Sequence, residues 1–243
     1  MRSAHCVAIL GVLITSPLHA VGYISISFWA FDQFAGGTPY YSHYSVTRND
    51  SSNFWNGAGT PETVCIVNMH DSGWGYSETV RSSYHAEAVI GSTGNQHAAL
   101  RNVGWHNFVY TFDLITNISS ISMDGNLIQQ GAFSGPLNWF SFNYNGRSYE
   151  SIIDDFAIRH DGSVIYSQQF ESSSLDEGWI VSRLDSGAYV NFNDNSNPRS
   201  GSGSLALGGN VSGIVFDLNS VPEPSAVVLS GISIMALCLR RKR

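Results

Sequence analysis

Two carboxylates in the second half of the chain have a spacing that could serve glycoside hydrolysis. Glu150 and Asp154 are four residues apart, and a pair of carboxylates on one strand face is what a glycosidase uses as acid and as base or nucleophile. The fuller pattern Glu-x-Asp-x-x-Glu does not occur in the chain. Asp154 and Asp155 are therefore expected to be structural: Asp154 either hydrogen-bonds the backbone of a neighbouring loop or helps to hold a stabilising cation.

Other catalytic and metal-binding patterns are missing from the sequence. Neither Gly-x-Ser-x-Gly nor His-Glu-x-x-His occurs, and these are the local signatures of a serine hydrolase and of a zinc protease. The six scattered histidines after residue 20 could form a zinc site only by long-range convergence; they are His43, His70, His85, His97, His106 and His160. We therefore expect no enzymatic activity and no cofactor; a structural calcium ion is compatible with the sequence, and its ligands are unknown.

Aromatic residues in loop-rich stretches could carry a different chemistry, the binding of sugars. Tyr41, Trp55, Trp74 and Tyr76 stand beside Gly, Ser and Asn. Aromatic faces stack on sugar rings, and neighbouring amides hydrogen-bond to sugar hydroxyls. Glycine-flanked tryptophans also plug the ends of β-sandwiches, so packing in the core or at its rim is the alternative for each of these residues.

The charge distribution argues against nucleic acid as a partner. Between Asp32 and Glu223 the chain holds seven arginines, no lysine and all 19 acidic residues, which leaves a formal charge of −12. A phosphate backbone would be repelled by such a domain. The 243 residues are 43% hydrophobic, which is enough to bury the core of one sizeable domain.

The elements that must position these residues are β-strands. Apolar and polar residues alternate in short segments separated by Gly, Asn, Asp and Ser, and the 24 glycines suit a protein with many turns. Asp124-Gly125 stands between two alternating runs, which predicts a β-hairpin. The predicted strands cover residues 23–31, 107–113, 119–128, 139–144 and 152–159. The sequence thus predicts an all-β protein, a sandwich or barrel.

Several of these segments resemble a known family. The matching residues are Gly104 to Val109, Met123-Asp124-Gly125 and Ile153 to Ile158. They resemble the second half of laminin-G-like or concanavalin-A-like jelly rolls, in which a Trp-His strand packs under the sheet, an Asp-Gly hairpin presents a loop and an Ile-Asp-Asp strand closes the domain. The resemblance implies a two-sheet antiparallel jelly-roll sandwich, a fold that carries lectins, hydrolases and adhesive modules alike.

The order of the motifs differs from that family. Phe170-Glu171-Ser172 and Ser200 to Leu207 resemble strands that open similar secreted jelly rolls, yet here they follow the closing strand. We therefore predict a circularly permuted domain over residues 21–220, in which the strands of 163–218 complete the sandwich that begins at Tyr23. Residues 163–218 alone would be too short for a stable two-sheet domain.

The first twenty residues read as an export signal. Arg2 precedes a short apolar stretch from Cys6 to Thr15, and a small residue, Ala20, follows Pro17; this is the pattern of a secretory signal peptide over residues 1–20. Of the three cysteines, only Cys65 then remains in the exported domain, since Cys6 lies in the signal and Cys238 in the C-terminal tail. A single cysteine forms no internal disulfide, and Cys65 is expected to fill a strand interior.

The last residues have three parts in a fixed order. Val221-Pro222-Glu223-Pro224 is followed by an apolar run that predicts a membrane helix at about 225–239, and the run ends in four cations, Arg240, Arg241, Lys242 and Arg243. This tail, residues 221–243, resembles the PEP-CTERM sorting signal. The resemblance implies a bacterial protein that an exosortase recognises in the membrane and releases toward the exopolysaccharide layer. An ordinary membrane anchor is the alternative.

Together these patterns predict a protein that is exported, held briefly in the membrane by its C-terminal helix and then delivered to the cell surface or extracellular matrix. The expected function is non-catalytic binding of exopolysaccharide or another glycan. The second hypothesis is a structural matrix protein without a ligand, and the third is a glycan-active hydrolase.

Overall fold

The computed structural model describes residues 22–33, 40–48, 63–70, 85–90, 103–146 and 150–221. These residues form β-strands joined by turns and loops, with one short 3-10 helix, η2 (Leu218–Ser220). The predicted all-β class is confirmed. The strands are β1 (Tyr23–Asp32), β2 (Tyr40–Thr47), β3 (Thr63–His70), β4 (His85–Ile90), β5 (Gly104–Asp113), β6 (Ile118–Met123), β7 (Asn126–Ala132), β8 (Trp139–Gly146), β9 (Ser151–His160), β10 (Ser163–Gln168), β11 (Trp179–Leu184), β12 (Tyr189–Asp194), β13 (Ser204–Gly208) and β14 (Val211–Asp217).

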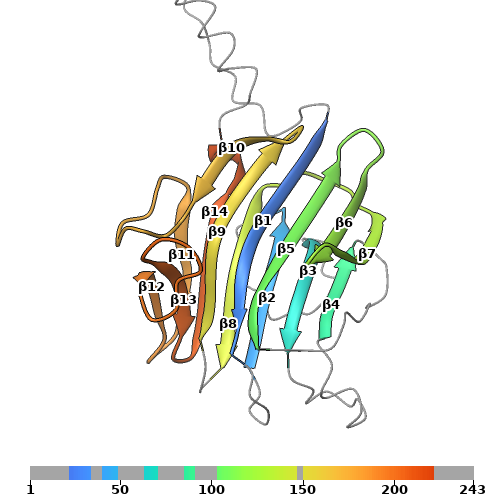
Figure 1. Cartoon of the computed structure of the whole chain (residues 1–243). Coiled ribbons are helices and arrows are strands. Elements are labelled where there is room, and N and C mark those ends of the chain that lie inside the picture. Colours follow the sequence, from blue (N-terminus) through green and yellow to red (C-terminus); the bar gives the residue numbers. More distant parts are fainter. Residues whose placement is uncertain are drawn as a thin grey trace, which may run out of the picture.

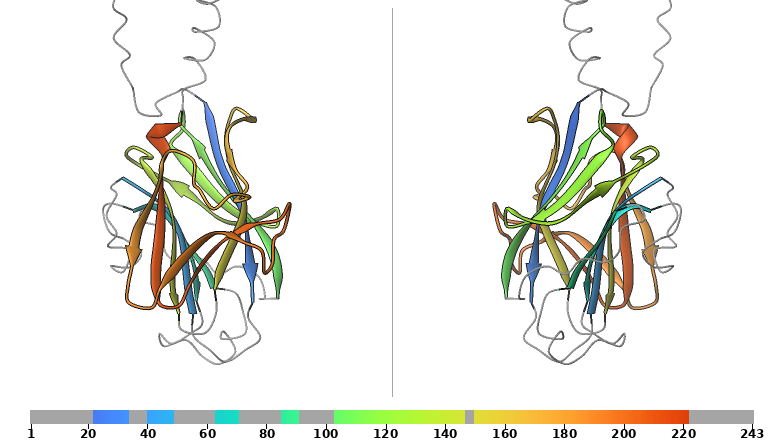
Figure 2. Two further views of the ribbon diagram at one scale, coloured as in Figure 1. Left: turned by 90° about the vertical axis from the view of Figure 1, so that its left-hand side faces the viewer. Right: turned by 90° about the vertical axis from the view of Figure 1, so that its right-hand side faces the viewer.

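The described strands form two antiparallel sheets that lie as two layers (Figures 1 and 2). The eight-stranded sheet has the order β12-β13-β9-β1-β5-β6-β7, with β10 also paired to β9. The six-stranded sheet has the order β11-β14-β8-β2-β3-β4. Strands with one apolar face must bury that face, and stacking two such sheets is the simplest solution.

The strands after residue 162 belong to both sheets. In the eight-stranded sheet β10 and β13 pair with β9, which pairs in turn with β1, while β12 extends the sheet beyond β13. In the six-stranded sheet β14 pairs with β8, and β11 forms the edge beyond it. The direct partners of β1 are β5 and β9. The C-terminal strands therefore share their sheets with strands from the N-terminal half (Figure 1).

The alternation in β1 sets its two faces. Ile24, Ile26 and Phe28 are buried between the sheets, whereas Ser25 and Ser27 on the other side are partly exposed. Because successive side chains of a strand point to opposite faces, the even positions of β1 serve the core and the odd positions face away from it. The predicted strands at 23–31 and 107–113 are confirmed, each with the expected buried face.

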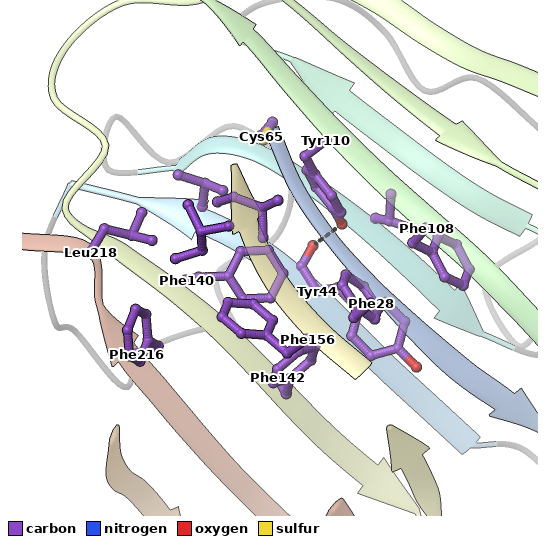
Figure 3. Close-up of a cluster of buried hydrophobic side chains, with 14 of the residues drawn as sticks. Phe28, Tyr44, Cys65, Phe108, Tyr110, Phe140, Phe142, Phe156, Phe216 and Leu218 are labelled. Carbon is purple, nitrogen blue, oxygen red and sulfur yellow. Dashed lines mark hydrogen bonds between the residues drawn. The ribbon is translucent and has the colours of Figure 1, made fainter. Parts of the chain in front are cut away.

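The core between the sheets is aromatic (Figure 3). Phe28 is fully buried, and its ring centroid lies 4.9 Å from that of Tyr44 and 4.9 Å from that of Phe142 in the opposite sheet. The Tyr110 hydroxyl donates to the carbonyl oxygen of Tyr44 at 2.7 Å, which satisfies a polar group in the middle of the core. Cys65 fills the interior of β3 with no exposed surface, and this burial raises the pKa of its thiol.

The predicted hairpin at Asp124-Gly125 is also confirmed. It joins β6 to β7, and both turn residues have positive φ, 52° and 78°, as a two-residue hairpin turn of type I′ requires. The Asp124 carboxylate lies 2.6 Å from Nδ1 of the buried His106 and accepts from the backbone N–H of Asn107 at 2.8 Å. Hydrogen bonds thus join the Trp-His segment to the Asp-Gly turn, which follows it by 17 to 18 residues.

The expected Phe-Glu-Ser strand is wrong. Residues 170–172 lie in the connection between β10 and β11, and Phe170 is buried with φ 56°. The pairing of β10 with β9 ends at Gln168, and the left-handed φ of Phe170 turns the chain away from the sheet. The Phe170 side chain still reaches the core, where its ring centroid lies 5.7 Å from that of Trp179.

Two predicted segments lie outside the described residues: the signal peptide at 1–20 and the helix at about 225–239 of the C-terminal tail. Within the described part of the chain, the structure contains no helix that is long and apolar enough to cross a membrane. The described chain ends at Val221, which is buried against the core directly after η2.

Candidate functional site

A groove of about 620 Å³ runs along the face of the eight-stranded sheet that points away from the core, and we call it the outer groove. It lies over β1, β5, β9 and β10, which are neighbours in the sheet (Figure 1). Hydroxyl, amide, charged and aromatic side chains line it together with a few apolar ones. The lining residues are Ser25, Ser27, Trp29, Asn107, Val109, Asp155, Phe156, Ala157, Arg159, Val164, Ser167 and Gln169.

A β-bulge in β9 shapes the groove. Ser27 is opposite Ala157 and Trp29 is opposite Asp154, so two residues of β9 face the single residue between them on β1. The extra residue is Asp155, whose φ of 52° is in the left-handed region. A bulge inserts one residue and redirects the side chains around it. Asp155 and the next residue, Phe156, both line the groove, and the buried ring of Phe156 packs in the core.

The bulge also divides the side of β9 that faces away from β1 into two separately paired stretches. β13 pairs with residues 151–153 and β10 pairs with residues 156–160, so neither strand pairs with Asp154 or Asp155. Residues 195–203, which connect β12 to β13 and which we call the strap, fill this gap. The sequence carries no local sign of the strap's position at this gap, because Asp154 and Asp155 are more than 40 residues earlier in the chain than the strap residues they bind.

Asp154 anchors the strap from below. Its side chain is fully buried, and its Oδ2 accepts from the backbone N–H groups of Arg199 and Ser200, each at 3.0 Å. Its Oδ1 accepts from the N–H of Asp155 at 2.7 Å. Burial raises the pKa of this carboxyl, against the lowering effect of the backbone donors. The first of the two structural roles expected for Asp154, a hydrogen bond to a neighbouring loop backbone, is confirmed.

Asp155 holds the side chains of the strap. Its Oδ2 accepts from the Arg199 guanidinium at 2.5 Å, and its Oδ1 accepts from the Ser200 hydroxyl at 2.6 Å. The same guanidinium lies over the ring of Trp29, with Cζ 3.6 Å from the ring centroid. Trp29 is thus held between the sheet and the strap, with part of its surface still open to the groove.

A third carboxylate, that of Glu171, fixes the far end of the strap. Glu171 accepts from the backbone N–H of Ser202 at 2.8 Å and from its hydroxyl at 2.6 Å. These hydrogen bonds to the charged form lower the pKa of Glu171. The Phe170-Glu171-Ser172 segment and the segment that starts at Ser200 therefore meet in the structure, where the Glu171 carboxylate joins them through Ser202.

The two carboxylates with glycosidase-like spacing have separate partners. Glu150 accepts a hydrogen bond from the hydroxyl of Tyr189, and Asp154 is covered by the strap. Neither carboxylate lines the outer groove. Among the described residues, no group of three or more His, Cys, Asp or Glu side chains is placed to hold a metal ion.

The aromatic residues predicted to bind a glycan are not part of the described site. Trp55, Trp74 and Tyr76 lie outside the described residues, and Tyr41 is described only as a backbone position in β2. Sequence reasoning missed Trp29, Arg159 and the strap. A signal for Trp29 was available, since a large aromatic residue follows Ser25 and Ser27 on the half-exposed face of the alternating segment YISISFWAF.

Comparison with known proteins identifies the tail. Residues 220–243 match the PEP-CTERM protein-sorting motif, which confirms the prediction made from the three-part tail. The motif marks the chain as a substrate for exosortase sorting, with export and a membrane-anchored intermediate. A search of curated proteins finds no significant match to the chain.

Proposed function

We propose that the chain is a non-catalytic glycan-binding module of the jelly-roll type, delivered to the cell surface or extracellular matrix by its sorting tail. The observation that carries the proposal is the outer groove itself, a polar channel with Trp29 at its side. A sugar ring has an apolar face and a rim of hydroxyls, and a site for it combines an aromatic surface with hydroxyl and amide groups. Ser27, Asn107 and Gln169 supply such groups here.

The arrangement of the sheets supports a single jelly-roll-type module. β10, β12 and β13 extend the sheet that contains β1, and β11 and β14 extend the opposite sheet. This pairing is what a circularly permuted sandwich would need, because the late strands would occupy the places of missing early ones. The groove depends on the late segment of the chain, since Val164, Ser167 and Gln169 line one of its sides and Arg199 of the strap lies over the ring of Trp29.

The path of the tail is compatible with display of the groove. The start of β1 and η2 lie at the same end of the sandwich (Figure 2). The sorting tail continues from Val221 at that end. A domain held at one end presents the lengthwise face of its eight-stranded sheet to the surrounding matrix, and the outer groove runs along that face.

One observation favours a second function, that of a structural matrix protein without a ligand. Arg199 already lies over the ring of Trp29 and is fixed by Asp155. An aromatic surface that is covered by its own chain offers less area to a sugar. In this reading the strap serves only to close the gap in β9, and the protein contributes bulk and negative charge to the matrix.

A binding experiment separates the two functions. The full chain, purified in mild detergent so that its tail is retained, is titrated with a panel of neutral and acidic polysaccharides. We expect one class to bind and Trp29→Ala to weaken that binding about tenfold, the effect of losing one aromatic contact. Trp139→Ala is the matched control, because Trp139 is a partly buried tryptophan on the outer face of the six-stranded sheet. Absence of binding across the panel would support the structural function instead.

A further inference from the structure

The outer groove carries a positive charge in a domain that is otherwise strongly acidic. Its charged lining residues are Asp155 and Arg159. Asp155 is neutralised by Arg199 at 2.5 Å. Asp154 lies close by, but it is fully buried beneath the strap and does not line the groove. The remaining charge of the groove is that of Arg159.

Arg159 has an unused capacity to bind an anion. It lies on β9 beyond the bulge, in register with Ser25 on β1 and with Val164 on β10. Among the described residues its guanidinium makes one hydrogen bond, from Nη1 to the Ser27 hydroxyl at 2.8 Å, and it forms no ion pair. A guanidinium has five N–H donors in a planar fork that matches an oxyanion with two oxygens. Most of these donors are still available.

We propose that the outer groove selects an acidic sugar, whose carboxylate or sulfate group pairs with Arg159. This inference rests on the proposed glycan-binding function and names its substrate class. The hydroxyl of Ser27 holds the guanidinium in place, and the hydroxyl and amide groups around it bind the uncharged part of the sugar. A half-buried arginine without a carboxylate partner is costly to keep, and an anionic ligand offsets that cost.

Because the whole domain is acidic, an anionic glycan is attracted only at short range, where it contacts Arg159. Seven arginines against 19 acidic residues repel a polyanion at long range. At physiological salt, charges separated by more than about 8 Å are largely screened. An acidic glycan therefore gains attraction only where it contacts Arg159 directly, and selectivity comes from contact in the groove rather than from general charge.

Matched ligands and variants test the proposal. The full chain in mild detergent is titrated at physiological salt with an oligogalacturonate, with its carboxyl-reduced neutral form and with a sulfated galactan oligomer of equal length. We expect an acidic form to bind about tenfold or more tightly than the neutral one. Arg159→Gln should abolish that preference, and Arg159→Lys should restore part of it. Arg183→Gln is the control. Arg183 lies on β11 of the six-stranded sheet, away from the groove, and forms an ion pair with Asp185 directly after that strand.

The outcomes distinguish this inference from the proposed function. Preference for the carboxylate or for the sulfate, lost in Arg159→Gln but kept in Arg183→Gln, supports the inference and identifies the oxyanion. Equal binding of the acidic and neutral oligomers, weakened by Trp29→Ala, overturns the acidic preference and leaves glycan binding intact. Absence of binding to every oligomer and polysaccharide overturns both. Thermal unfolding of each variant verifies that the fold is retained.

Discussion

Phe28 and Trp29 are neighbours in the chain, yet they belong to opposite faces of the eight-stranded sheet. Phe28 packs among five aromatic rings of the core, with no exposed surface. Trp29 lines the outer groove under Arg199. The inner face is built by short-range alternation and close packing, whereas the outer face is completed by a strap from residues 195–203. Stability and ligand binding are therefore expected to reside on different sides of one strand.

Removing a ring from the inner face should have the largest effect. Phe28→Ala leaves a cavity among rings from both sheets, and such a change costs about 3–5 kcal/mol of unfolding free energy. Urea unfolding of the full chain in mild detergent measures the loss. A cost below about 1 kcal/mol would mean that the two sheets do not depend on this contact, and the comparison between the faces would fail.

Removing the anchor of the strap should have an intermediate effect. Asp154→Ala leaves the N–H groups of Asp155, Arg199 and Ser200 without their acceptor, and an unsatisfied buried donor costs about 1–3 kcal/mol. Limited proteolysis within residues 195–203 should become faster in this variant. Asp154→Asn is the control, because its one amide oxygen can still accept from the N–H groups of Arg199 and Ser200, and only the N–H of Asp155 loses its acceptor. Equal behaviour of the two variants would contradict the anchoring role.

Removing the Glu171 carboxylate, which binds Ser202 at the other end of the strap, should have the smallest effect on stability. The effect should depend on pH. The folded pKa of Glu171 is lowered below its usual 4.5, so its stabilisation is present above pH 4.5 and is lost as the pH falls through the folded pKa. The advantage of the wild type over Glu171→Gln in unfolding temperature should shrink between pH 6 and pH 3. A constant difference over that range would show that Glu171 does not hold Ser202 through its charge.

The inner face could be predicted from sequence because its signals are local. Alternation placed Ile24, Ile26 and Phe28 on one side of β1, and the Asp-Gly pair marked the turn between β6 and β7. The sorting tail was equally readable, since its three parts are contiguous. In each case a few neighbouring residues determine the outcome.

The outer groove could not be predicted in the same way. Its bulge places Asp155 in a left-handed conformation inside a strand, which the alternation of the segment does not indicate. The contacts of the strap join Asp154 to Ser200 across 46 residues. Phe170 reads as a strand residue but turns out of the sheet. The Ile-Asp-Asp segment could be recognised in the sequence. Its hydrogen-bond partners in residues 195–203 could be identified only from the tertiary structure.

Parallel measurement of stability and binding in two adjacent variants tests the central claim most directly. Phe28→Leu and Trp29→Ala, each in the full chain, are compared with the wild type for unfolding temperature and for affinity toward the polysaccharide that binds best in the panel. The account predicts that Phe28→Leu lowers the unfolding temperature and keeps the affinity, while Trp29→Ala weakens the affinity about tenfold with a smaller change in stability. Loss of affinity in neither variant, or in both equally, would contradict a ligand site on the outer face.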